Sequence, residues 1–143
     1  MRFACLVIFA LAACNLTCAA QIPDPQSPSA TELVHLARQK SPLLEQAIHA
    51  SFPARAVELG RVWAGQQRDF FFTIRTHSKP QLVIDDGPEL AMDSIPGTDL
   101  WYAAPTIERL GALHSFHYVI DGKPFGGTLT YRHSASCPIV YPV

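Results

Sequence analysis

The hydrophobic positions of this chain change their spacing near Ala56. Before that point they recur at helical intervals, which predicts two helices, over residues 29–39 and 41–52. Ser29 and Glu32 form a capping-box pattern at the start of the first helix, in which each side chain bonds the other residue's backbone amide. The helical part of the chain is therefore expected to lie within residues 29–52.

After Ala56 the pattern is one of short strands separated by turn residues. Asp69–Arg75 is the clearest strand, because its side chains are mainly aromatic or β-branched. His114–Ile120 is followed by Asp121-Gly122, a two-residue sequence that favours a hairpin turn. The other expected strands are residues 61–64, 81–84, 90–95, 100–104 and 123–131, the last with a bulge or bend at Gly126-Gly127.

Strands this short, with turn signals this closely spaced, predict a mainly β fold. We expect a β-sandwich over residues 54–131, preceded by a helical segment at 30–53. Residues 21–29 are rich in proline and are expected to form a linker. Residues 132–143 have no clear period and are expected to form an irregular tail.

The first twenty residues have the pattern of a secretion signal. Arg2 supplies a positive charge, and Phe3–Ala13 is an uncharged apolar stretch too short to span a bilayer, which needs roughly 20 residues. Cys18-Ala19-Ala20 offers small residues before a cleavage site at Gln21. The chain is therefore expected to be exported, to the periplasm or outside the cell.

A lipoprotein signal is an alternative interpretation of the same residues. Leu11-Ala12-Ala13-Cys14 resembles the sequence at which Cys14 is lipidated and becomes the mature N-terminus. The membrane would then be a partner only through that lipid anchor. With cleavage after Ala20 instead, Cys137 is the single cysteine of the mature chain, which leaves no internal disulfide.

The composition and the polar residues limit the chemistry that we expect. A formal net charge of −1 argues against a nucleic-acid binder, which would show a basic stripe. No Gly-x-Ser-x-Gly elbow occurs, so we expect no catalytic residues of that kind. His114 and His117 would point to opposite faces of a strand, and Asp85-Asp86 is typical of a turn. No metal site and no cofactor are expected.

Aromatic residues are the better candidates for ligand contact, because exposed rings on a sandwich can pack against sugars. Trp101 and Tyr102 are neighbours on an expected strand, so their side chains should point to opposite faces. We expect Trp101 to point inward and Tyr102 outward. The candidate ligand- or partner-contacting residues are Tyr102, Trp63 and His117.

Two motifs carry a resemblance to a known family. Pro-Gly-Thr-Asp-Leu-Trp-Tyr spans residues 96–102, and His-x-Phe-x-Tyr-x-Ile-Asp-Gly spans residues 114–122. In this order and spacing they resemble the N-terminal early-set, immunoglobulin-like domain of secreted bacterial esterases of the enterochelin-esterase type. The resemblance extends over about residues 32–128. That domain is in turn similar to the sandwich modules of glycogen-branching and isoamylase-type enzymes, some of which bind α-glucans.

The resemblance implies an immunoglobulin-like β-sandwich and an accessory role. In such esterases an α/β-hydrolase domain follows the sandwich and carries the nucleophile, and none of its catalytic residues has a position in this sequence. The implied partners are that esterase domain or a glycan. An inactive esterase fragment and a free-standing envelope glycan-binding or interaction protein are the alternatives.

Overall fold

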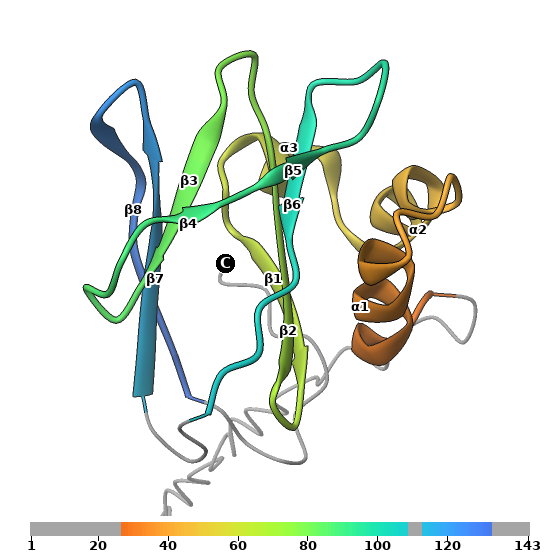
Figure 1. Ribbon diagram of the computed structural model, residues 1–143, viewed down its shortest axis with the longest axis horizontal. Coiled ribbons are helices and arrows are strands. Elements are labelled where there is room, and N and C mark those ends of the chain that lie inside the picture. The colour runs from red at the N-terminus through yellow and green to blue at the C-terminus, as the bar shows by residue number, and fades with distance from the viewer. Residues whose placement is uncertain (1–26, 109–112, 133–143) are drawn as a thin grey trace, which may run out of the picture.

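The computed structural model describes residues 27–108 and 113–132, and this part is mainly β with a few short helices (Figure 1). The helices are α1 (Ala30–Arg38), α2 (Leu44–Ser51) and α3 (Ala54–Glu58). The strands are β1 (Val62–Gln66), β2 (Asp69–Arg75), β3 (Pro80–Ile84), β4 (Leu90–Ala91), β5 (Asp93–Ser94), β6 (Leu100–Ala103), β7 (Leu113–Ile120) and β8 (Lys123–Arg132). The expected signal at 1–20, the lipidation site Cys14, residues 21–26 of the linker and the tail from residue 133 with Cys137 lie outside the described residues.

The strands form two antiparallel sheets. Sheet A has the order β1-β2-β6-β5, and sheet B has the order β4-β3-β7-β8. The chain passes from sheet B to sheet A between β4 and β5, where the single residue Met92 separates the two strands and is buried. One extended segment therefore belongs to both sheets, as the strand that crosses the front of Figure 1 shows.

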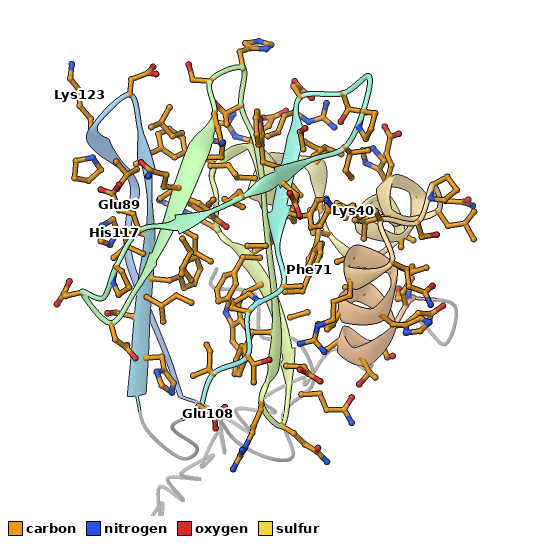
Figure 2. The ribbon with its side chains drawn as sticks, in the orientation of Figure 1. Lys40, Phe71, Glu89, Glu108, His117 and Lys123 are labelled. Carbon is orange, nitrogen blue, oxygen red and sulfur yellow. The ribbon has the colours of Figure 1, made fainter. Side chains whose placement is uncertain are left out.

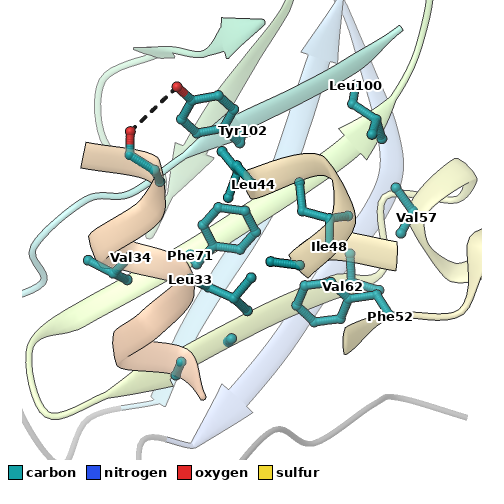
Figure 3. Close-up of a cluster of buried hydrophobic side chains, with 14 residues drawn as sticks. Leu33, Val34, Leu44, Ile48, Phe52, Val57, Val62, Phe71, Leu100 and Tyr102 are labelled. Atoms are coloured by element: carbon teal, nitrogen blue, oxygen red, sulfur yellow. Dashed lines mark hydrogen bonds between the residues drawn. The ribbon is translucent and has the colours of Figure 1, made fainter. Parts of the chain in front are cut away.

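The fold has three layers, with the helices on one face of sheet A and sheet B on the other (Figure 1). The inter-sheet core lies between the two sheets and is largely aromatic. Its buried members are Trp63, Phe70, Phe72, Ile74, Leu82, Met92, Ile107, Phe116 and Tyr118. The helix core lies between the helices and sheet A (Figure 3). Its larger buried members are Leu33, Val34, Leu44, Ile48, Phe52, Val57, Val62, Phe71, Leu100 and Tyr102.

Strand β2 contributes to both cores because both of its faces are covered. Phe71 points into the helix core, whereas Phe70 and Phe72 point into the inter-sheet core. The five residues from Phe70 to Ile74 are all buried. An uninterrupted run of large apolar side chains is what a strand covered on both faces requires.

The helices follow the sequence pattern with two differences. Helix α1 begins where expected, and one bond of the expected capping box is present: Ser29 Oγ accepts a hydrogen bond from the Glu32 amide at 3.2 Å. Helix α2 starts three residues after Ser41. The Ser41 carbonyl accepts a hydrogen bond from the Leu44 amide, which closes a turn before the helix. Helix α3 was not expected from the sequence. Its five residues are too few for an apolar period to be recognised.

Most strand predictions are confirmed. Asp69–Arg75 is β2, and the Asp121-Gly122 turn has the positive φ angles, 51° and 72°, that the hairpin requires. The register between β7 and β8 shifts opposite Gly126-Gly127, where a bulge was expected. The segment 90–95 was expected to be one strand, but it is divided between the two sheets at Met92.

Candidate functional site

The three residues expected to contact a ligand lie in different layers. Tyr102 belongs to the helix core, Trp63 belongs to the inter-sheet core, and His117 lies on the outer face of sheet B. The structure therefore does not bring them together into one site.

The expectation that Tyr102 points into solvent is wrong. Its side chain does point away from Trp101, as strand alternation requires, but α1 and α2 cover that face and leave Tyr102 only 4% exposed. Its hydroxyl donates to the Ala37 carbonyl in α1 at a long 3.5 Å, drawn as the dashed line in Figure 3. The expectation treated the helical segment as a preface to the sandwich. Its apolar stripe instead needs a partner surface, and sheet A supplies that surface.

Trp63 is also buried, with 6% of its surface exposed. Its ring stacks on Phe70 with the centroids 5.9 Å apart. The Trp63 ring is therefore not available to pack against a sugar. Trp101 points inward as expected: it packs on the inter-sheet core and its Nε1 donates to the Thr76 carbonyl at 3.0 Å.

His117 is the one expected contact residue that reaches the surface. It is partly exposed and alternates along β7 with the buried Phe116 and Tyr118, which places it on the outer face of sheet B opposite Val83 (Figure 2). Its neighbour in the same strand, His114, is buried, so the two histidines point to opposite faces as expected.

His114 forms a close pair with Asp85. The His114 ring is 1% exposed, and its Nδ1 lies 2.5 Å from Asp85 Oδ2. The other carboxylate oxygen of Asp85 accepts the Ser115 amide at 2.9 Å. Asp85 and Asp86 both have positive φ angles, 53° and 54°, and form the turn after β3, as the sequence predicted. This Asp–His pair therefore ties the end of β3 to the start of β7.

A pocket of about 500 Å³ opens between the α1–α2 turn and the part of sheet A formed by the edge strand β5 and its neighbour β6. Lys40, labelled in Figure 2, stands on the helix side of this pocket. Its lining residues are Lys40, Ser41, Pro42, Leu44, Glu45, Asp93, Ser94, Ile95, Pro96 and Tyr102. The volume is in the range of small-molecule sites, which are roughly 300–1,000 Å³.

The turn between α1 and α2 fixes the helix side of the pocket. The Lys40 amide donates to the Ala37 carbonyl and the Ser41 amide donates to the Leu36 carbonyl, both at 3.0 Å. These two bonds make a Schellman motif, in which Lys40 takes the left-handed conformation at φ 50° that glycine usually occupies. The motif thus sets the position of the Lys40 backbone at the pocket mouth.

The register between β5 and β6 positions the residues on the sheet side of the pocket. Asp93 in β5 is the direct antiparallel partner of Tyr102 in β6, so both side chains lie on the helix-facing side of sheet A. Burial, and secondarily the Asp93 carboxylate, raises the pKa of the Tyr102 hydroxyl above its ordinary value. The hydroxyl therefore stays protonated and neutral. Asp93 also pairs with Lys40, its Oδ1 lying 3.8 Å from Nζ.

The pocket has one cationic and two anionic side chains around an apolar wall. Glu45, the second acidic residue, lies in the first turn of α2, and its Oε1 is 3.7 Å from Nε2 of His49. Sequence reasoning missed Lys40, Glu45 and Asp93. A lysine at a glycine-favoured helix end gives no signal, and the pairing of Asp93 with Tyr102 becomes visible only once the register is known.

Among residues 27–108 and 113–132, no group of three or more histidine, cysteine or acidic side chains could hold a metal ion. Within the same part of the chain, no helix combines the length and the hydrophobicity needed to cross a membrane.

Comparisons with protein-family models, with curated proteins and with solved structures found no match for this chain.

Proposed function

We propose that this chain is an immunoglobulin-like β-sandwich module that acts as the non-catalytic N-terminal accessory domain of a secreted esterase. The observation that supports the immunoglobulin-like fold in this proposal is the strand order. If β1 to β8 are named A, B, C, C′, D, E, F and G, sheet A has the order ABED and sheet B has the order C′CFG. Immunoglobulin-like sandwiches divide their strands between two sheets in this way.

The two motifs behind the family resemblance support the same proposal. Residues 96–102 form the turn into β6 and most of that strand, and residues 114–122 form β7 and its hairpin turn. These are strands E and F of the proposed scheme, one in each sheet, and their side chains pack against the inter-sheet core through Trp101, Phe116 and Tyr118.

The partner that we propose is a protein domain, the α/β-hydrolase domain that follows such sandwiches in the esterases. Tyr102 and Trp63 are buried, which removes two aromatic rings from a sugar platform. The DNA directly downstream offers the first test, because a hydrolase reading frame should be found there. The purified hydrolase should then bind this chain in a titration followed by calorimetry. An unrelated downstream gene together with retention on insoluble α-glucan would favour a free-standing glycan-binding protein instead.

The residues around Cys14 favour a second candidate, an envelope-anchored interaction protein. Mass spectrometry of the mature chain distinguishes the two. Soluble export gives an N-terminus at Gln21, whereas lipidation gives an acylated Cys14 and recovery in the membrane fraction.

A further inference from the structure

The pocket beside Lys40 has a lining that suits a cation better than an anion. Its charged side chains are one ammonium, on Lys40, and two carboxylates, on Asp93 and Glu45. An anion would approach two like charges, and Glu45 already places a negative charge at the N-terminal turn of α2, where an anion would otherwise be favoured. The balance of fixed charge therefore attracts a cation.

Tyr102 adds an acceptor to this lining. Its hydroxyl is protonated, because burial and then Asp93 raise its pKa, and its proton is directed to the Ala37 carbonyl. The lone pairs of the hydroxyl oxygen can then accept a hydrogen bond from a ligand. An ammonium group has three N–H donors, and the pocket lining offers acceptors on Asp93, Glu45 and Tyr102.

The Asp93 carboxylate already pairs with a cationic group, the ammonium of Lys40. Its Nζ lies 3.8 Å from Asp93 Oδ1, and both side chains are largely exposed. A pair of this kind is weak in water, so an ammonium or guanidinium group from another molecule can replace Lys40. The apolar wall of Pro42, Leu44 and Ile95 then suits a hydrocarbon body next to the charge.

We propose that this pocket binds an organic cation, a primary ammonium or guanidinium group carried on an apolar body. The charge is held by Asp93 and Glu45, Tyr102 accepts one of its hydrogen bonds, and Lys40 is the internal competitor that it displaces. This site does not depend on the proposed accessory role, because a small ligand can bind here whatever the sandwich contacts.

Three probes of similar shape test the charge preference. 4-Phenylbutylamine is the cation, 4-phenylbutanol is its neutral counterpart and 4-phenylbutanoate its anionic one. Titration of the full chain, followed by NMR or calorimetry, should show binding of the amine that is at least about tenfold tighter than that of either counterpart. Equal binding of the alcohol, or tighter binding of the carboxylate, would overturn the proposal.

Variants test the assigned residues. Asp93→Asn and Glu45→Gln should each weaken amine binding, by about two- to fivefold, because the carboxylates are exposed to water. Glu89→Gln is the matched control: Glu89 is an exposed acid of the β3–β4 connection, outside the pocket lining, and its substitution should leave affinity unchanged (Figure 2). Unchanged affinity in both pocket variants, with thermal melts that show intact folding, would also overturn the proposal.

Lys40→Asn gives the sharpest result, because the sign of its effect separates the two kinds of ligand. Asparagine tolerates the left-handed conformation at this position, so the turn should persist. Removal of the competitor should tighten amine binding by about two- to fivefold. An anion site would instead lose its cation and bind more weakly.

A short acetylated peptide with a central lysine between two leucines then distinguishes the two sources of the cation. Binding equal to that of the free amine indicates a basic peptide side chain, and much weaker binding indicates a small amine.

Discussion

Trp101 and Tyr102 are adjacent in β6, yet they belong to different cores. Trp101 packs on the inter-sheet core and donates to the Thr76 carbonyl, whereas Tyr102 lies beneath α1 and α2. Side-chain alternation along a strand separates the two rings, and the helical layer then buries the one that a two-layer sandwich would expose. Because Tyr102 is a core residue, its substitution should lower the stability of the fold.

Tyr102→Ala should destabilise the protein about as strongly as a typical core substitution, by about 3–5 kcal/mol, because it removes a buried ring. Tyr102→Phe keeps the ring and loses only the long hydrogen bond to Ala37, so it should cost less than about 1 kcal/mol. Urea unfolding followed by circular dichroism measures both. A Tyr102→Ala variant as stable as the parent would mean that the helices do not cover this face.

Leu33→Ala tests whether the helical layer is part of the fold. Leu33 is fully buried against sheet A, and its truncation should cost about 2–5 kcal/mol. Leu43→Ala is the matched control at the residue before α2, because Leu43 is 59% exposed and its truncation should change stability by less than about 0.5 kcal/mol. Thermal melts of the two variants give the comparison. Equal melting temperatures would contradict the three-layer arrangement.

Asp85→Ala should destabilise the fold by about 2–3 kcal/mol, because it removes the hydrogen bonds to His114 and to the Ser115 amide. Asp86 has the same left-handed backbone and an exposed side chain, so Asp86→Ala should cost only the conformational strain, about 1 kcal/mol. Denaturant unfolding at neutral pH measures the difference. Equal losses in the two variants would show that the turn conformation, and not the Asp–His pair, determines the stability here.

Stability should fall at alkaline pH. Burial raises the pKa of the Tyr118 hydroxyl well above its ordinary value, and this hydroxyl donates to the Thr73 carbonyl at 3.2 Å. Below about pH 10 the tyrosine is neutral in both the folded and the unfolded chain. Above that pH only the unfolded chain loses the proton, which favours unfolding by up to about 1.4 kcal/mol per pH unit for each such tyrosine.

Tyr118→Phe isolates this contribution. The variant should lose about 1 kcal/mol at neutral pH with the hydrogen bond to Thr73, and its stability should then fall less steeply than that of the parent above about pH 10. Unfolding free energies measured from about pH 8 to about pH 11 show the two slopes. Identical slopes would mean that Tyr118 ionises as readily in the folded state as in the unfolded state.

The sequence was most informative where the interactions are local. The aromatic run of Asp69–Arg75, the Asp121-Gly122 turn and the Ser29 cap each depend on neighbouring residues, and each was predicted correctly. The third layer was missed although its signal was present. A strand without polar alternation, β2, needs cover on both faces, and the apolar stripe of α1 needs a surface to cover.

The pocket could not be predicted in the same way. It depends on the register that places Asp93 beside Tyr102 and on the turn that places Lys40 at the end of α1. Both are set by backbone hydrogen bonds whose positions no residue type in the sequence marks. The division of residues 90–95 between two sheets has the same origin, because no residue type in that segment indicates where the strand changes partners.

The division of residues 90–95 between β4 and β5 limits how the two sheets can separate. Strands β4 and β5 stand at the same edge of the two sheets and are joined through Met92, so a short extended segment acts as a hinge along that edge. The opposite edge, formed by β1 and β8, has no such connection in the described residues. Transient separation of the sheets should therefore widen at the β1–β8 edge, and water should first reach the aromatic core there, beside Trp63.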